Sequence, residues 1–155
     1  MNKYFVIDAN GKKHTRNSKR TYTHVVLCRN SKEAAIRLAN RRPHWLKENF
    51  WYHHAFLDGT SKWLERSPYE TDEARYMERV KEEVERSRKA LMGCTTPDEW
   101  FAVIRANALA AIEKVDYGAW HVAGWCGRHD LAVKRAHKAI CGELVGEAII
   151  LPVSV

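Results

Sequence analysis

Apolar and polar positions alternate at the start of the chain in a pattern that predicts β-structure. Residues 3–9 alternate in this way, Asn10-Gly11 is a strong two-residue turn signal, and residues 12–16 supply the returning strand. Residues 21–29 are rich in β-branched side chains and tyrosine, which favours a third strand near the centre of a sheet. The sequence therefore predicts an opening hairpin followed by a central strand.

The next segment predicts a short helix and then a second hairpin. A capping-box pair, Asn30 and Glu33, precedes apolar residues at helical spacing, and Pro43 limits the helix to about residues 31–41. Residues 50–57 resemble an aromatic strand that returns after a tight turn as residues 60–65. A helix over residues 45–54 is the open alternative.

Two similar capping motifs predict a pair of long helices. Ser67-Pro-Tyr-Glu70 and Thr96-Pro-Asp-Glu99 each place a hydroxyl, a proline and a glutamate as a helix start requires. We expect one helix from Pro68 to about Met92, ended by Gly93 in a left-handed conformation, and another over residues 97–115. Together they predict a helical hairpin over residues 67–115.

The C-terminal part predicts a strand, a helix and a strand over residues 119–125, 130–140 and 147–153. Pro152 cannot donate a hydrogen bond within a sheet, so the last strand is expected to lie at a sheet edge or to end at Pro152. The fold class predicted is α+β, with a mixed or antiparallel sheet, and the expected organisation is one domain over residues 1–155.

The charge is unevenly distributed along the chain. The net charge is +7, and residues 1–66 hold fourteen Lys and Arg against five Asp and Glu. Residues 67–115 hold eight against ten, and residues 116–155 hold four of each. A basic region attracts polyanions, which include nucleic acids and phosphorylated small molecules, although a solvated basic face is the plain alternative.

Neither a signal-peptide pattern nor a membrane-spanning apolar stretch is present, which predicts a cytoplasmic protein with no membrane partner. Cys28, Cys94, Cys126 and Cys141 lie far apart and form no C-x-x-C pair, so we expect reduced thiols.

Metal binding and catalysis both have weak support. The set Cys126, His129, His137 and Cys141 has outer spacings that suit zinc but an unusually short middle spacing, so no metal is expected. Cys126 beside His129 or His121 is the one nucleophile candidate, and it lacks an orienting third group. Walker, dinucleotide-binding and nucleophile-elbow motifs are absent, so we expect a protein that is not an enzyme and uses no cofactor.

Phosphate binding requires only converging donors and positive charge, and three places offer them. Residues 124–128 turn from a strand into a helix start, where free amides and the Arg128 fork favour an anion, unless Arg128 is simply solvated. Arg105 lies in the apolar helix near Asn107, Trp100 and Phe101, and we expect it to pair with a carboxylate, such as Glu78 or Asp116, or with a ligand phosphate.

The third place is the loop before the central strand, where Arg16, Lys19 and Arg20 could clamp a phosphate or form only a solubilising turn. The most basic third of the chain also contains six aromatic residues, a mixture that nucleic-acid-binding surfaces use although such residues are more often core. They are Trp45, Phe50, Trp51, Tyr52, Phe56 and Trp63.

Two strings, Thr15-Arg-Asn-Ser-Lys-Arg-Thr-Tyr-Thr-His-Val-Val26 and Trp125-Cys-Gly-Arg-His-Asp-Leu-Ala-Val-Lys134, resemble segments of small bacteriophage proteins. The order of elements, a sheet and two long helices before a strand, helix and strand, is similar to that of the phage Thoeris anti-defence sponge proteins. Against that plan, residues 43–66 are an insertion.

The resemblance implies a homodimer, or a larger assembly, that sequesters a cyclic ADP-ribose signal without destroying it, and some family members also take cyclic oligonucleotides. The family's pockets place arginines and an aromatic ring at the protomer interface. The matching residue types here are Arg105, Arg128 and Asn107 with Phe101 or Trp100.

The hypothesis from the sequence is thus a phage counter-defence protein that binds a nucleotide signal without catalysis. The rival hypothesis is a basic nucleic-acid-binding protein, or an inhibitor of a nucleic-acid-guided defence complex.

Overall fold

The computed structural model describes the whole chain, residues 1–155. The chain folds into two compact units, and each is described by itself. The sheet unit consists of Met1–Asn40 and Leu109–Val155, and the helical unit consists of Arg41–Ala108. The α+β fold class is confirmed, whereas the single domain stays a prediction.

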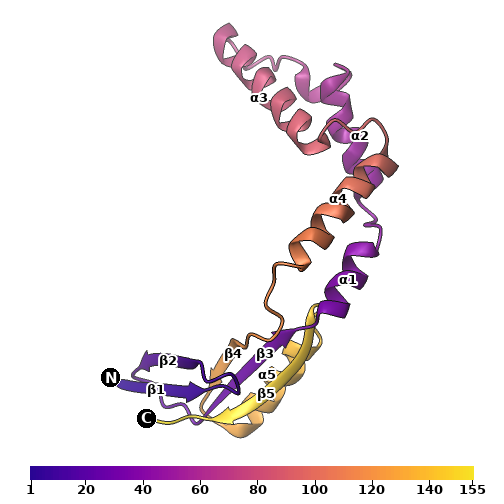
Figure 1. Cartoon of the computed structure of the whole chain (residues 1–155). Helices are drawn as coiled ribbons and strands as arrows, with labels where there is room; N and C mark the ends of the chain where they lie inside the picture. The colour runs from indigo at the N-terminus through magenta and orange to yellow at the C-terminus, as the bar shows by residue number, and fades with distance from the viewer. The chain divides into compact units, whose positions relative to one another are not determined.

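The sheet unit contains the predicted hairpin and a separate three-stranded sheet (Figure 1). Strands β1 (Asn2–Ile7) and β2 (Lys13–Ser18) pair antiparallel around the Asn10-Gly11 turn. Gly11 has φ of +80°, which explains why glycine is needed there. The hairpin is confirmed, but it forms its own two-stranded sheet, and its one β-bridge to the last residues of the chain joins Phe5 to Ser154.

The second sheet has the order β4-β3-β5, and all its pairings are antiparallel. Its strands are β3 (His24–Asn30), β4 (His121–Cys126) and β5 (Val145–Pro152). The central position of β3 and the edge position of β5, which contains Pro152, are confirmed.

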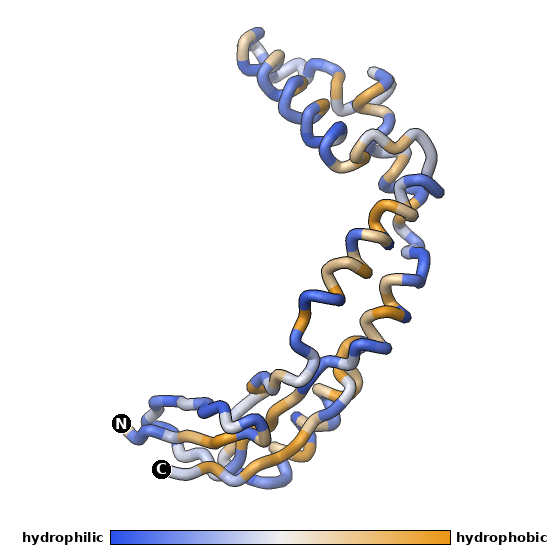
Figure 2. The backbone as a smooth tube through the Cα atoms, in the orientation of Figure 1, coloured by the Kyte–Doolittle hydropathy of each residue, from blue (hydrophilic) through white to orange (hydrophobic).

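Both faces of this sheet are covered. Val25 and Leu27 pack with Val6 of the hairpin, and Val26 packs with Ala132 of α5 (His129–Ile140) on the other face. Because successive strand residues point to opposite faces, Val25, Val26 and Leu27 are all fully buried. Figure 2 shows β3 accordingly as one of the hydrophobic stretches of the backbone.

Helix α1 (Lys32–Asn40) follows β3, as predicted. The capping residue differs from the prediction, because the Ser31 hydroxyl accepts a hydrogen bond from the amide of Ala34 at 3.2 Å. Asn30 instead ends the β3 ladder, where it pairs with Val145. Because Asn30 is paired with β5, the residue that caps α1 is Ser31, one position after the predicted cap.

The second predicted hairpin is wrong, and the open alternative describes the segment better. Residues Leu46–Leu57 form helix α2, followed by a short 3-10 helix, Lys62–Leu64. Leu46 and Phe50, one helical turn apart, are fully buried with Leu91 and Trp100 in the core of the helical unit. Burial of this face outweighs the β-propensity of the aromatic residues.

The two long helices are present as α3 (Glu73–Leu91) and α4 (Pro97–Ile112), and the last turn of α4 belongs to the sheet unit. Helix α4 begins as predicted, with the amide of Glu99 donating to the Thr96 hydroxyl at 3.2 Å. Helix α3 ends before Met92 and Gly93, which both have positive φ. Helix α3 packs on α2, so the expected pairing of α3 with α4 is replaced by an α2–α3 pair.

Helix α3 starts five residues later than predicted, at the N-cap Asp72, whose side chain accepts from the amides of Ala74 and Arg75. Ser67 and Glu70 form a turn instead, and the Glu70 carboxylate is bonded to Arg79. The Ser67-Pro-Tyr-Glu70 motif therefore does not cap a helix.

Candidate functional site

The candidate site is a groove in the sheet unit, along the edge strand β4. Strand β4 pairs only with β3, and its residues from Val122 to Cys126 line two adjoining hollows of about 680 and 390 Å³. The hollows share Arg20, Tyr22, Ala123, Trp125 and Arg135. We call the two hollows together the edge groove.

Five cationic side chains line the edge groove, and all five are exposed. They are Arg16 and Arg20, from β2 and the loop after it, and Lys134, Arg135 and Lys138 of α5. No aspartate or glutamate lines either hollow, and none of the five cations forms an ion pair. A concave surface lined by one sign of charge concentrates the electrostatic field and attracts anions.

Some of the other cations of the sheet unit are paired with carboxylates. Arg29 pairs with Glu147 at 2.5 Å, and Lys32 pairs with Glu113 at 3.0 Å. Exposed cations elsewhere in the unit, such as Lys3 and Arg37, form no ion pair either. The edge groove differs from them because five cations converge there on two hollows that contain no carboxylate.

Aromatic rings form part of the groove wall. The Tyr22 and Trp125 ring centroids lie 6.2 Å apart, and the Arg16 guanidinium lies 4.9 Å from the Tyr22 ring centroid. Tyr22 is buried against Tyr4, whereas Trp125 is half-buried and leaves part of its indole open to the groove. The indole offers a face or edge against which a base could pack.

Arg135 lies directly on the backbone of β4. Its Nη1 donates to the carbonyl oxygen of Ala123 at 2.9 Å. A Cβ atom at Gly124 would lie only 2.7 Å from Nε and 2.8 Å from Nη1 of Arg135. Glycine at position 124 therefore provides the space that the Arg135 side chain occupies.

The structure places only part of the predicted site in this groove. Arg16 and Arg20 lie in it, although Arg16 belongs to β2 and not to the loop. Arg128 precedes α5 as predicted, but its Nε and Nη2 bind the Asp130 carboxylate at 3.0 and 2.9 Å. Hydrogen bonding to Arg128 lowers the pKa of Asp130. The Arg128 fork is thus already occupied by an acid.

The other predicted residues lie on α4 within the helical unit. Trp100 is buried and donates its indole N–H to the Ala90 carbonyl at 2.8 Å, and Phe101 is half-buried beneath Arg42. Asn107 is exposed near the Met92 sulfur. Arg105 is exposed without a carboxylate partner, so the expected pairing with Glu78 or Asp116 is wrong.

Sequence reasoning missed most of the groove. The signal for Lys134, Arg135 and Lys138 was present, because positions i, i+1 and i+4 of a helix share one side. After Asp130, the predicted helix contains no acid that could neutralise them. The proximity of β2 to α5 across the edge of β4 had no signal in the sequence, since it depends on the order of the strands.

The cysteine and histidine candidates are dispersed. Cys126 is buried, Cys141 is exposed, and all four cysteines are free. The His129 ring packs against that of His24, with centroids 5.1 Å apart, and the Nε2 of His137 lies 4.0 Å from the Cys141 sulfur. No three His, Cys, Asp or Glu side chains are grouped so that they could hold a metal ion.

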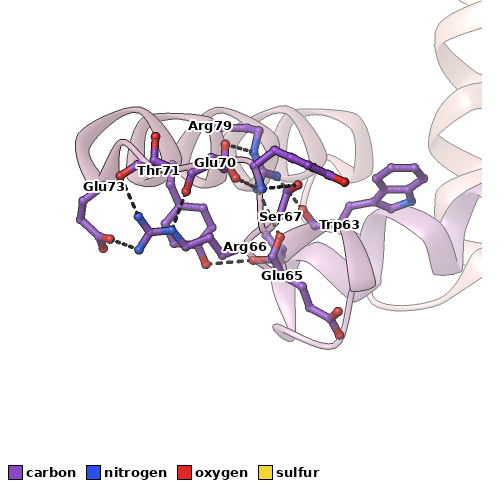
Figure 3. Close-up of polar contacts among 11 residues, drawn as sticks. Trp63, Glu65, Arg66, Ser67, Glu70, Thr71, Glu73 and Arg79 are labelled. Atoms are coloured by element: carbon purple, nitrogen blue, oxygen red, sulfur yellow. Dashed lines mark hydrogen bonds and ion pairs between the residues drawn. The ribbon is translucent and has the colours of Figure 1, made fainter.

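The helical unit has a hollow of about 1030 Å³ with a different character. It is lined by both cations and carboxylates from residues 62–82. Figure 3 shows Arg79 binding both oxygens of Glu70, at 2.8 and 3.0 Å, and the carbonyl of Trp63. Arg66 in turn binds Glu73 and the carbonyls of Glu70 and Thr71. These two arginines hold the loop before α3, and their guanidinium groups are already bound to carboxylates and carbonyl oxygens of the protein.

Comparison with protein-family models, with curated proteins and with solved structures found no match to this chain. None of the helices combines the length and the apolar character that crossing a lipid bilayer requires.

Proposed function

We propose that the protein binds a phosphate-bearing nucleotide in the edge groove and retains it without chemical conversion. One observation carries the proposal: five unpaired cations line a groove that contains no carboxylate. Phosphate oxygens are the natural partners of such a surface, because guanidinium and ammonium groups bind them through charge-assisted hydrogen bonds. Trp125 supplies an aromatic surface for the base.

The ligand class that we propose is a cyclic ADP-ribose-type signal, which the resemblance to phage sponge proteins implies. In this proposal the protein acts as a homodimer in the cytoplasm of an infected host and lowers the free concentration of a defence signal. The edge groove replaces the pair of Arg105 and Arg128 as the phosphate-binding site, because Arg128 is bound to Asp130.

The test is a thermal-unfolding series with cyclic ADP-ribose isomers, followed by native mass spectrometry. A ligand that binds only the folded state stabilises it by about 2.7 kcal/mol at a concentration one hundred times its Kd, which raises the Tm. We expect a raised Tm, a complex containing two chains, and a ligand of unchanged mass after release. The absence of a Tm shift with every isomer would refute this ligand class, and a changed mass would refute retention without conversion.

Single-stranded nucleic acid is the second candidate, and the two adjoining hollows favour it because they extend the cationic surface beyond one phosphate. For single strands, log K falls with log salt by about 0.7 for each phosphate neutralised. Fluorescence anisotropy with a labelled oligothymidine should then give a steep salt slope. A slope near zero would exclude this candidate, and a steep slope without a response to cyclic ADP-ribose would favour it over the first.

A further inference from the structure

We propose that Arg135 is the phosphate anchor of the edge groove and that Gly124 determines the affinity of the groove by leaving room for the Arg135 side chain on β4. This inference deepens the proposed function and rests on it. It concerns one residue pair, so it can fail while the groove still binds phosphate.

The first support is the position of Arg135. It lines both hollows of the edge groove, whereas Lys134 and Lys138 line only the larger one and Arg16 only the smaller one. Arg20 also lines both hollows, but its hydrogen bond to the Ser18 hydroxyl is made by the backbone amide and does not hold the guanidinium. Arg135 is therefore the cation that lies within reach of a ligand in either hollow and whose side chain is held by a hydrogen bond.

The second support is the way Arg135 is held. Its Nη1 donates to the Ala123 carbonyl, which leaves the Nε and Nη2 donors without a protein partner. A guanidinium offers planar, paired donors that match two phosphate oxygens, which the point charge of a lysine does not. A side chain that is ordered before binding loses less conformational entropy when the ligand arrives.

The third support is Gly124. The three atoms nearest to a Cβ built at this position all belong to Arg135, and the φ of Gly124 lies outside the left-handed region. An alanine would therefore fit the backbone and would displace only the Arg135 side chain from its place on β4. Gly124 is thus a positioning residue that acts through Arg135.

The experiment is a double-mutant cycle with inorganic pyrophosphate as the probe, measured by isothermal titration calorimetry. Arg135→Ala should weaken binding roughly 10- to 100-fold, because one charge-assisted contact is lost. Gly124→Ala should weaken binding to a similar extent without lowering the Tm. In the double variant, Gly124→Ala should add no further loss, because the side chain that it displaces is absent.

Two further variants separate the geometry of Arg135 from its charge. Arg135→Lys keeps the charge and should recover only part of the affinity. Arg37→Ala removes an exposed cation of α1 in the same unit, outside the groove, and should bind pyrophosphate as the unchanged protein does.

The possible failures are distinguishable. If the unchanged protein binds neither pyrophosphate nor any nucleotide, the proposed function falls and this inference falls with it. If it binds pyrophosphate and Arg135→Ala binds equally well, only the anchor is wrong. If Gly124→Ala lowers the Tm and weakens binding also in the Arg135→Ala background, Gly124 has a structural role instead of a positioning one.

Discussion

The two units of the chain contain almost the same number of cations but balance them with very different numbers of acids. The sheet unit has fourteen Lys and Arg against seven Asp and Glu, and the helical unit has twelve of each. The whole net charge of +7 therefore belongs to the sheet unit. A boundary drawn along the sequence at residue 66 hides this division, because the sheet unit is made of two separate segments.

The arginines of the helical unit and the cations of the edge groove also differ in whether they form ion pairs with carboxylates. In the helical unit Arg42, Arg66, Arg79, Arg86 and Arg88 are all engaged by carboxylates. In the edge groove none is. Positive charge thus becomes a candidate site only where the fold leaves it without an acid, and a count of basic residues does not reveal where that happens.

The exposed aromatic residues show the reverse distribution. Trp45, Trp51, Tyr52, Trp63 and Tyr69 are all exposed, and all belong to the helical unit. The mixture of aromatic and basic residues that the sequence shows over residues 1–66 is therefore divided between the two units. The nucleic-acid hypothesis consequently depends on the edge groove and not on one continuous aromatic basic face.

The largest expected effect concerns the core of the helical unit. It tests whether the aromatic segment that contains Phe50 is a helix or the predicted hairpin strand. Phe50 is fully buried and Tyr52 is 47% exposed, whereas a strand would point both to the same face. Phe50→Ala should lower the free energy of unfolding by about 3–5 kcal/mol, measured by denaturant titration. Tyr52→Ala should cost within about 1 kcal/mol. Equal losses of unfolding free energy in the two variants would contradict the helix and favour the predicted strand.

The next effect concerns charge placement. Lys134→Glu with Lys138→Glu reverses two groove cations and should weaken binding of a labelled oligothymidine by roughly 100-fold or more, measured by fluorescence anisotropy at fixed salt. Lys47→Glu with Lys81→Glu gives the same net charge but changes the helical unit. If both pairs weaken binding equally, global charge and not the edge groove attracts the polyanion.

The smallest effect concerns acidification, to which the two units should respond in different pH windows. In the helical unit, burial lowers the pKa of His53, opposed by the nearby Glu83. The ring also faces the Ser87 hydroxyl, with Nδ1 and Oγ 3.1 Å apart, and packs near Tyr52 and Trp100. The unfolded state then binds the proton more readily, so stability is fully present above about pH 6.5 and falls as the pH drops below it.

In the sheet unit, the hydrogen bond to His14 lowers the pKa of the buried Asp8, aided by the amides of Asn10 and Lys12 and opposed by burial. This stability is present above about pH 4 and is lost only as the pH falls through the lowered pKa. Hydrogen-exchange protection factors, which correct for the intrinsic exchange rate at each pH, should therefore fall in α2 and α3 between pH 7.5 and 5 before they fall in β1 and β2.

His53→Gln should abolish that loss of protection, whereas substitution of the exposed His44 by Gln should leave it unchanged. A loss of protection that begins in the β1–β2 hairpin would contradict the assignment of the two pH windows.

The sequence by itself determined the elements whose signals are local. The hairpin at Asn10-Gly11, the start of α4 at Thr96 and the strand, helix and strand of the C-terminal part all lie where turn, cap and spacing signals predict them. Such signals act between residues a few positions apart, so they survive whatever the rest of the chain does. The fold class followed from them.

The tertiary structure decided what depends on a distant neighbour. Residues 46–57 are a helix because Leu46 and Phe50 find Leu91 and Trp100, and Glu70 left its predicted cap because Arg79 binds it. The edge groove exists because β4 is an edge strand that brings Arg20 and Arg135 together. Burial and ion pairing depend on which residues lie next to one another in space, and residues far apart in the sequence become neighbours only when the chain folds.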